Sequence, residues 1–334
     1  MNSANKSQPL KDPYNRRIDY LRISITDKCN LKCIYCTPSE GIKYFQEKEV
    51  LTDDEILRFV RIARKHGLRK VRITGGEPLV RNSIVKLVSS IKGIGIRDLS
   101  LTTNGILLSK LAGELKRAGL DRVNISLDSM DPDKYRAITK GGDINLVWQS
   151  IKDAEKAGLS PVKINVVPIR GVNDDEISSF AALTFEKNYH IRFIEFMPAT
   201  CNGIWKKDKC VSSAEAMEKI SALGELERLR FRGRGPSRNY RIKGASGVIG
   251  FISPMSDHFC GHCSRLRLTA DGKIRPCLFS NIKIDIKTPM RNGATDEEIE
   301  KLFFQAVKVK PQRHQLNEDI TTAAHLKAMS KIGG

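Results

Sequence analysis

The run Cys29-Asn-Leu-Lys-Cys33-Ile-Tyr-Cys36 spaces three cysteines as C-x3-C-x2-C, directly after a strand-like run over 20–26. Thiolates are soft ligands that suit iron–sulfur centres. A four-iron cluster held by three cysteines keeps one iron without a protein ligand, and that iron can bind and activate a small molecule. The motif therefore predicts an open iron–sulfur cluster at the place where this protein carries out its chemistry.

Zinc and disulfide bonds are the alternatives for these cysteines. A structural zinc site takes four ligands, and no Cys or His follows Cys36 until His66. Disulfides need an oxidising compartment. The chain begins Met-Asn-Ser-Ala-Asn-Lys, without the apolar segment of a secretory signal, so we expect a reducing cytoplasm in which the eight cysteines serve metal binding.

Length and composition allow a large core, because 40% of the 334 residues are hydrophobic. One barrel with an appendage fits as well as two domains. No apolar run reaches transmembrane length, so a membrane is not an expected partner. The formal net charge of +19 predicts a polyanionic partner, either a nucleoside triphosphate or nucleic acid. The tract Arg230–Arg238 resembles an RNA-binding segment, although we favour an ordinary basic loop.

Strand-like and helix-like runs alternate over the first 200 residues. The run over 52–66 has an apolar stripe of helical period, a capping box of Thr52 with Glu55, and Gly67 at its end. Repeated strand–helix units predict a parallel sheet, either open or closed into a barrel. The expected strands are Tyr20–Thr26, Val71–Thr74, Leu99–Asn104, Arg122–Asp128, Val162–Ile169 and Ile191–Met197.

Polar and apolar side chains alternate along the first five of these strands, and alternate residues of a strand share one face. The apolar faces must pack against helices, so the polar faces point inward and enclose a wet, ligand-holding interior. The sixth strand departs from this pattern, because Glu195 and Met197 share a face with Ile191 and Phe193. The expected inward set is Arg22, Ser24, Thr26, Arg72, Thr74, Ser100, Thr102, Asn104, Asn124, Ser126, Asp128, Lys163 and Asn165.

A second group of three cysteines lies in the later part of the chain. Cys260 and Cys263 precede two strand-like runs joined by Asp-Gly, a hairpin signal that returns Cys277 toward them. The spacing C-x2-C-x13-C fits a cluster, and it equally fits zinc with His258 or His262 as the fourth ligand. The first group of cysteines favours a second cluster.

Arg265 and Arg267 share one face of the first strand of this hairpin. Guanidinium groups bind phosphate oxygens with two parallel hydrogen bonds. Together with the inward-facing Arg22, Arg72 and Lys163, they supply five cations for one polyanion. A nucleoside triphosphate is the ligand that this set predicts.

These motifs resemble those of the radical S-adenosylmethionine (SAM) superfamily, in which an aromatic residue precedes the third cysteine, here Tyr35. The stretch Gly75-Gly76-Glu77-Pro78 belongs to the same pattern. Within the superfamily, the chain resembles the GTP 3′,8-cyclases of molybdenum cofactor biosynthesis over nearly its whole length. The fragments Arg72-Ile-Thr-Gly-Gly-Glu-Pro, Phe259-Cys260-x2-Cys263-x-Arg265-x-Arg267-Leu and the terminal Gly333-Gly334 carry that resemblance.

The resemblance implies an α/β fold, a partial (β/α)6 TIM-type barrel with a C-terminal extension of strands and helices that carries the second cluster. The expected division is a flexible N-terminal segment over 1–16, the barrel over 17–200, and a C-terminal region over 201–334. The Gly-Gly tail is expected to reach into the active site. Cys201, Cys210 and the connection between residues 199 and 210 depart from the family pattern.

The resemblance also implies two [4Fe-4S] clusters, SAM and a set of site residues. Cys29, Cys33 and Cys36 would hold the SAM-cleaving cluster, and Cys260, Cys263 and Cys277 the cluster that takes the guanine. Tyr35, Gly76, Ser126 and Met197 would contact SAM. Arg22, Arg72, Thr102, Lys163, Arg265 and Arg267 would bind GTP, with Arg22, Arg265 and Arg267 also expected to be catalytic.

The implied activity is that of a lyase. A 5′-deoxyadenosyl radical would take hydrogen from C3′ of GTP, and the carbon radical would attack C8 to give 3′,8-cyclo-7,8-dihydro-GTP. A cyclic pyranopterin monophosphate synthase would use this product.

The expected partners are a reductant protein of unknown identity and a second copy of the chain in a homodimer, and no nucleic acid is expected. The alternatives are a radical SAM enzyme acting on another nucleotide or a peptide, and a zinc-containing RNA-binding protein.

Overall fold

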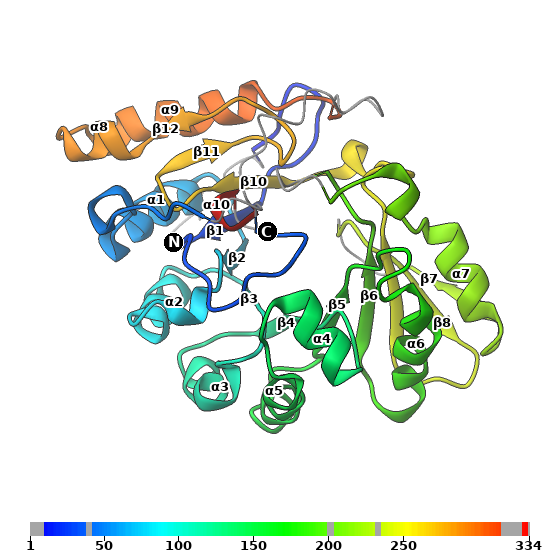
Figure 1. The fold of residues 1–334 in the computed structure, drawn as a ribbon. Helices are drawn as coiled ribbons and strands as arrows, with labels where there is room; N and C mark the ends of the chain where they lie inside the picture. Colours follow the sequence, from blue (N-terminus) through cyan, green and yellow to red (C-terminus); the bar gives the residue numbers. More distant parts are fainter. Residues whose placement is uncertain (1–9, 38–41, 199–203, 231–234, 315–328, 333–334) are drawn as a thin grey trace, which may run out of the picture.

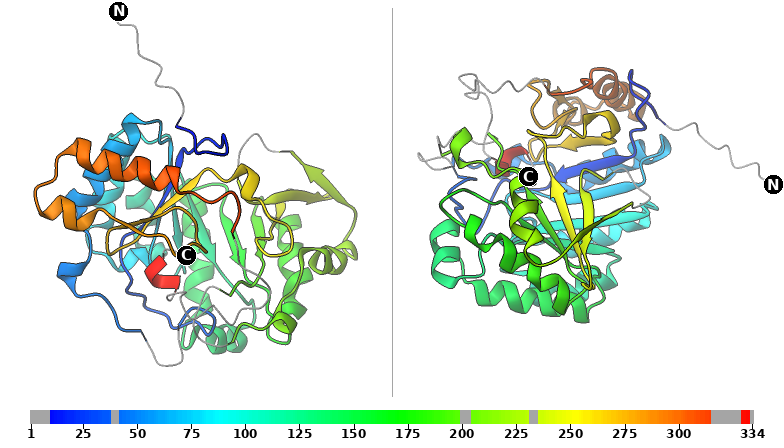
Figure 2. Two further views of the ribbon diagram at one scale, coloured as in Figure 1. Left: turned by 90° about the horizontal axis from the view of Figure 1, so that it is seen from above. Right: turned by 90° about the vertical axis from the view of Figure 1, so that its right-hand side faces the viewer.

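A curved sheet of twelve strands organises the part of the chain that the computed structural model describes, residues 10–37, 42–198, 204–230, 235–314 and 329–332 (Figures 1 and 2). The strand order is β12-β11-β10-β1-β2-β3-β4-β5-β6-β9-β8-β7. Cys201, Gly333 and Gly334 lie outside the described residues, and so do positions 231–234 of the basic tract.

Six parallel strands with their helices form the middle of this sheet, which confirms the predicted partial barrel. The helices lie around the outer face of the sheet (Figure 1). The strands are β1 (Tyr20–Ser24), β2 (Lys70–Thr74), β3 (Asp98–Thr103), β4 (Arg122–Ser126), β5 (Lys163–Val166) and β6 (His190–Ile194). The helices are α1 (Asp53–Lys65), α2 (Ile84–Gly93), α3 (Leu108–Arg117), α4 (Pro132–Thr139), α5 (Ile144–Lys156) and α6 (Ile177–Glu186).

The first helix begins and ends where local chemistry predicts. Thr52 accepts a hydrogen bond from the backbone N–H of Glu55 at 3.2 Å, and the Glu55 carboxylate accepts one from the Thr52 N–H at 2.8 Å. Gly67 follows the helix with a φ of +90°, a conformation that glycine adopts without steric cost. The apolar stripe of α1 is buried, including Phe59 and Val60 at 0% exposure.

Strands from the later part of the chain extend the parallel sheet at both edges. β9 (Val248–Ile252) pairs with β6, and β10 (Arg265–Leu268) pairs with β1, each in parallel. Eight neighbouring strands are therefore parallel. The Asp-Gly hairpin is confirmed, since β10 pairs antiparallel with β11 (Lys273–Arg275) and Gly272 has a φ of +76°.

The remaining elements flank these edges. The strands are β7 (Leu226–Leu229), β8 (Arg238–Ile242) and β12 (Ile284–Asp285). The helices are α7 (Ser213–Ser221), α8 (Lys287–Arg291), α9 (Asp296–Lys308) and α10 (Met329–Ile332). Single 3-10 turns cover Glu47–Glu49, Pro78–Val80, Asp174–Glu176, Lys207–Lys209 and Cys260–His262.

The first described residues differ from the expectation of a flexible segment over 1–16. A bridge joins Lys11 to Arg17, and Asp12 and Arg16 are each only 6% exposed. The Arg16 guanidinium donates to the Asp12 carboxylate at 2.6 Å and to the Cys260 carbonyl at 2.8 Å. The long-range bond to Cys260 holds Arg16 against the second group of cysteines, and polarity alone did not indicate it.

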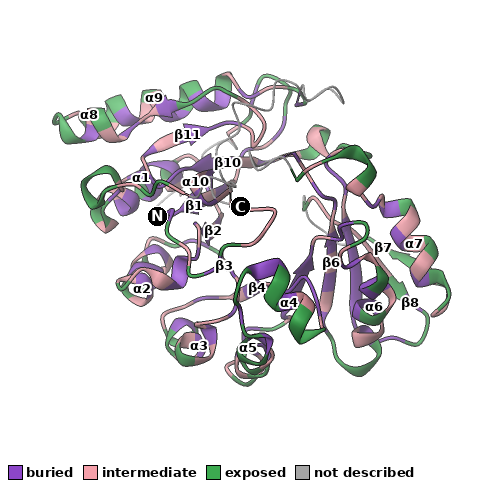
Figure 3. Cartoon of the chain, in the orientation of Figure 1, coloured by how far each residue is buried: buried purple, intermediate pink, exposed green. Residues whose placement is uncertain are grey.

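The apolar core lies between the sheet and its outer helices, whose inner sides are buried and outer sides exposed (Figure 3). Ile23 and Ile73 are fully buried there, and Arg22 and Arg72 project from the opposite face of the same strands. Among the described residues, no helix has the combined length and apolar character needed to cross a bilayer.

We expect Phe303→Ala to lower the free energy of unfolding by about 3–5 kcal/mol. Phe303 is 3% exposed and packs edge-on against Phe59 at 5.8 Å, so it joins α9 to the first barrel helix. Phe304 is its matched control, because it is 37% exposed and its loss should cost less than about 1 kcal/mol. Denaturant titration of both variants measures this, and equal losses would contradict the assigned packing.

Candidate active site

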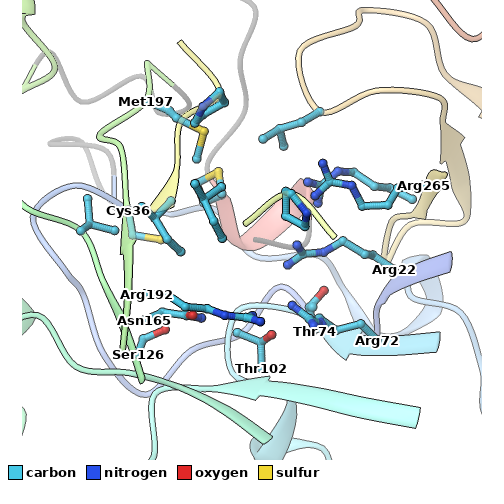
Figure 4. A pocket seen from close by; sticks show the side chains of 18 of the residues that line it. Arg22, Cys36, Arg72, Thr74, Thr102, Ser126, Asn165, Arg192, Met197 and Arg265 are labelled. Carbon is cyan, nitrogen blue, oxygen red and sulfur yellow. The ribbon is translucent and has the colours of Figure 1, made fainter. Parts of the chain in front are cut away.

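A cavity of about 450 Å³ lies on the inner side of the sheet. Figure 4 shows side chains from opposite walls facing this space, with Cys36 and Met197 on one side and Arg22 and Arg265 on the other. Every predicted site residue lines it. These are Arg22, Cys29, Cys33, Tyr35, Cys36, Arg72, Gly76, Thr102, Ser126, Lys163, Met197, Cys260, Cys263, Arg265, Arg267 and Cys277.

The first thiol group, Cys29, Cys33 and Cys36, sits on the loop that follows β1. The backbone N–H of Cys36 donates to the Cys33 carbonyl at 2.9 Å, a turn that keeps these two thiols on the same side of the loop. Leu31 N–H points at the Cys29 sulfur at 3.4 Å, and Asn104 Nδ2 lies 3.9 Å from it. Secondary structure and loop hydrogen bonds thus gather three soft donors at one wall.

The surroundings of these thiols raise the pKa of all three, chiefly through burial. Burial raises the pKa of Cys36 to about 12, and the charges of Cys29 and Asp128 add to the effect. The raised pKa favours the neutral thiol in the absence of a cation, and a bound metal would stabilise the thiolate form that ligates it. The donor set therefore fits an iron–sulfur centre. Among the described residues, no three His, Cys, Asp or Glu side chains converge closely enough to hold a single metal ion.

Close backbone contact explains the glycines that follow β2. A Cβ on Gly76 would lie 2.3 Å from the Lys28 carbonyl oxygen, so a side chain there would displace the cysteine loop. The neighbouring Glu77 carboxylate accepts from Leu79 N–H at 3.0 Å, Asn104 N–H at 2.7 Å and Thr103 Oγ1 at 2.8 Å. Burial raises the pKa of Glu77 to about 7, and this effect outweighs the hydrogen bonds, which act to lower the pKa.

A tyrosine–carboxylate contact joins the cysteine loop to the ends of β4 and β5. The Tyr35 hydroxyl donates to Asp128, which also accepts from the Val167 N–H at 2.8 Å. Burial raises the pKa of Asp128 to about 6, although the Tyr35 hydrogen bond opposes the shift. The loop that carries the first thiol group is therefore fixed to the carboxyl ends of neighbouring strands, the position of active sites in barrels of this kind.

Strand register places the predicted cations beside one another. Arg22 pairs across the sheet with Arg72 on one side and Arg267 on the other. Burial lowers the pKa of Arg22, and the nearby charge of Arg267 lowers it further. The Arg22 Nε is buried without a hydrogen-bond partner, as is the Thr102 hydroxyl. Repelling cations and unused polar atoms in a cavity indicate a missing anionic ligand.

Lys163 responds to the same crowding. Burial lowers its pKa to about 6, and the charges of Arg192, Arg122 and Arg72 act in the same direction. The ammonium is therefore destabilised until negative charge arrives in the cavity.

Arg192 is a lining residue that sequence reasoning missed. It lies opposite Asn165 in the register of β5 and β6, and its Nη1 donates to Asn124 Oδ1 at 3.4 Å. Burial lowers its pKa to about 9. The run over 191–197 was expected to be one strand, in which Met197 shares a face with every second residue before it. Because β6 ends at Ile194, that alternation does not continue to Met197, and it did not identify Arg192 as facing inward. Alternation within 190–194 was the available signal.

The second thiol group is Cys260, Cys263 and Cys277. Burial raises the pKa of Cys260, as it does for the first group, but the surroundings of Cys263 differ. Burial raises the pKa of Cys263, but the charges of Arg265 and Lys310 outweigh it and lower the pKa to about 6. This favours a thiolate, the form that binds metal. The donor set fits a second iron–sulfur centre.

The histidines of the zinc alternative do not line the cavity. His258 Nδ1 lies 2.7 Å from the Pro254 carbonyl, and His262 lies on the short turn that starts at Cys260. Cys210 is also outside the cavity, with its thiol near the Phe196 carbonyl at 3.6 Å. None of these three residues is positioned at the cavity wall as a fourth ligand beside either thiol group.

Two family profiles match separate parts of the chain. The radical SAM superfamily matches residues 23–184, and Molybdenum Cofactor Synthesis C matches residues 189–316. A GTP 3′,8-cyclase of Thermodesulfovibrio yellowstonii is 50% identical over 328 residues, covering 97% of this chain and 100% of that protein. A GTP 3′,8-cyclase of Pelotomaculum thermopropionicum is 48% identical, with the same coverage.

Solved structures share the fold at low sequence identity. Streptococcus suis SuiB bound to S-adenosylmethionine has a TM-score of 0.57 and 16% identity, with 81% of this chain and 64% of that chain covered. Native anSMEcpe with bound AdoMet has a TM-score of 0.54 and 13% identity, covering 88% of this chain and 81% of that one. Both are consistent with the curved sheet described above.

Proposed function

The chain belongs to the GTP 3′,8-cyclase family of the radical SAM superfamily, and we propose that it converts GTP to 3′,8-cyclo-7,8-dihydro-GTP in molybdenum cofactor biosynthesis. One observation carries the proposal: both thiol groups and a row of cations line the same cavity. A triphosphate can be held by the cations while both ends of the nucleoside remain within reach of the two thiol groups.

We assign two [4Fe-4S] clusters and SAM to this cavity. The first thiol group would hold one cluster and the second thiol group the other, while Tyr35, Gly76, Ser126 and Met197 would contact SAM. When bound, the first cluster and SAM supply the one-electron chemistry that removes a hydrogen atom from the substrate. The contribution of the chain is to bring C3′ and the guanine into fixed positions.

The substrate contacts follow from register and charge. Arg22, Arg265 and Arg267, on the neighbouring strands β1 and β10, are assigned to the triphosphate and to catalysis by positioning it. Arg72 and Lys163 lie further along the same inner face, and Thr102 is assigned to the ribose. The buried wall of the cavity around these groups would exclude water from the reacting atoms.

We also propose partners and a cellular compartment for this chain. A reductant protein would supply electrons, a cyclic pyranopterin monophosphate synthase would take the product, and the chain would act as a homodimer. Every cysteine among the described residues is a free thiol, which supports placement in a reducing cytoplasm.

Anaerobic turnover tests the activity. Reconstituted protein with SAM and a strong reductant should form 5′-deoxyadenosine and a cyclised nucleotide with GTP, and not with ATP, CTP or UTP. Mass spectrometry of both products gives the result. SAM cleavage that is indifferent to all four nucleotides would point to another substrate such as a peptide, and iron-free, zinc-loaded protein would favour the RNA-binding alternative.

Arg267→Gln should weaken GTP binding by roughly 10- to 100-fold, because it removes a buried charge-assisted contact to phosphate. SAM cleavage at the first cluster should persist. Equilibrium binding of GTP and 5′-deoxyadenosine formation are measured together. Arg291→Gln is the control, since Arg291 pairs with Glu55 at 2.7 Å on the outside of the sheet. Lost SAM cleavage with unchanged GTP affinity would overturn the assignment.

GTP binding at about pH 8 should be accompanied by proton uptake of up to about one proton. With a pKa of about 6, Lys163 is neutral in the free cavity at that pH, and an arriving triphosphate raises the pKa and charges it. Calorimetry in buffers of different ionisation enthalpy measures the uptake. Lys163→Met should abolish it, while Lys134→Met, at a salt bridge with Asp175, should retain it. Wild-type binding without uptake would contradict this role.

A further inference from the structure

Lys310 is a buried cation that joins the two arms of the hairpin carrying the second thiol group. It is 3% exposed, and its ammonium donates to the Arg265 carbonyl at 2.8 Å and to the Pro276 carbonyl at 2.7 Å. Arg265 follows Cys263 by two residues, and Pro276 directly precedes Cys277. One side chain therefore links the backbone beside two of the three cysteines.

Two further buried cations bind main-chain carbonyls around the same group. Arg275 is 2% exposed and donates to the Leu278 carbonyl at 3.1 Å and the Ser280 carbonyl at 2.6 Å. This closes the loop around Cys277. Arg16 donates to the Cys260 carbonyl at 2.8 Å. The backbone at or beside each cysteine of the group is thus held by a cation.

The carbonyls that bind the Lys310 ammonium place its charge in the part of the hairpin that carries Cys263 and Cys277. Burial lowers the pKa of Lys310, and the charges of Cys263 and Cys277 act against that shift. A buried ammonium is stable only near compensating negative charge. The first thiol group has no such cation among the charges that act on Cys36, which are those of Cys29 and Asp128.

We propose that Lys310 is a positioning residue for the second iron–sulfur centre, holding the Cys263 and Cys277 arms at the separation the cluster needs and supplying positive charge beside its thiolates. The inference rests on the second cluster of the proposed function. Residues that orient metal ligands through hydrogen bonds typically change metal affinity 10- to 100-fold when replaced. The effect should be confined to the second site, because the hydrogen bonds of the Lys310 ammonium go to the carbonyls of Arg265 and Pro276, which lie beside cysteines of the second thiol group.

Iron release from the full chain, reconstituted anaerobically, tests this. Lys310→Met removes both donors and the charge, Lys310→Gln keeps an N–H donor without the charge, and Lys310→Arg keeps both. Lys219→Met is the matched control, because Lys219 donates to the Asp174 carbonyl at 2.9 Å far from either thiol group. A variant with Cys260, Cys263 and Cys277 replaced by alanine defines the signal of the first cluster alone.

Chelator-driven iron release and the electron paramagnetic resonance spectrum of the reduced protein are recorded for each. We expect Lys310→Met to lose second-site iron roughly 10-fold faster or more, with first-site iron and its spectrum unchanged. Lys310→Arg should release iron more slowly than Lys310→Met, and Lys219→Met should match wild type. If Lys310→Met does not fold, Lys310→Gln carries the comparison, with faster second-site release and a more negative second-site midpoint potential expected.

Two results would overturn the proposal. Wild-type release from the Lys310→Met or Lys310→Gln variant would show that Lys310 does not support the site, and equal loss from both sites would show only a general structural role. If the triple-alanine variant retained all of the wild-type iron, the second thiol group would hold no cluster. That result would contradict the proposed function, and it is measured independently of the Lys310 variants.

Discussion

Parallel pairing of β10 with β1 is the constraint on which the active site depends. It brings a strand from the last quarter of the chain to the edge of the first strand, with Arg267 opposite Arg22. The same pairing carries Cys263 to the inner side of the sheet, across the cavity from the loop that holds Cys36. Without this contact, the two thiol groups would not line one cavity.

The pairing also sets like charges side by side. Arg22 lies between Arg72 and Arg267, and its lowered pKa reports the cost of that arrangement and of burial. An uncompensated row of buried charges is destabilising, and an anionic ligand would offset that cost. In the proposed function, binding of the triphosphate would therefore relieve the repulsion among these arginines.

One cysteine of the second thiol group has electrostatic surroundings unlike those of the first group. Burial, with acidic neighbours such as Asp128, raises thiol pKa values in the first loop, whereas Arg265 and Lys310 lower that of Cys263. Both groups present three soft donors to the cavity, but the second lies within the cationic part of the lining. This difference supports the proposed division of roles, with one site for SAM and one for an anionic nucleotide.

Sequence alone determined the local structure and much of the site. Capping at Thr52, the strand alternation around Arg22 and the cysteine spacings depend on neighbouring residues, so they could be read without the fold. Tertiary structure alone decided which strands meet, since the β1–β10 register, the inward face of Arg192 and the contacts of Lys310 join residues distant in the chain. Such contacts depend on packing across the whole sheet, and the periodicity of a local stretch of sequence cannot predict them.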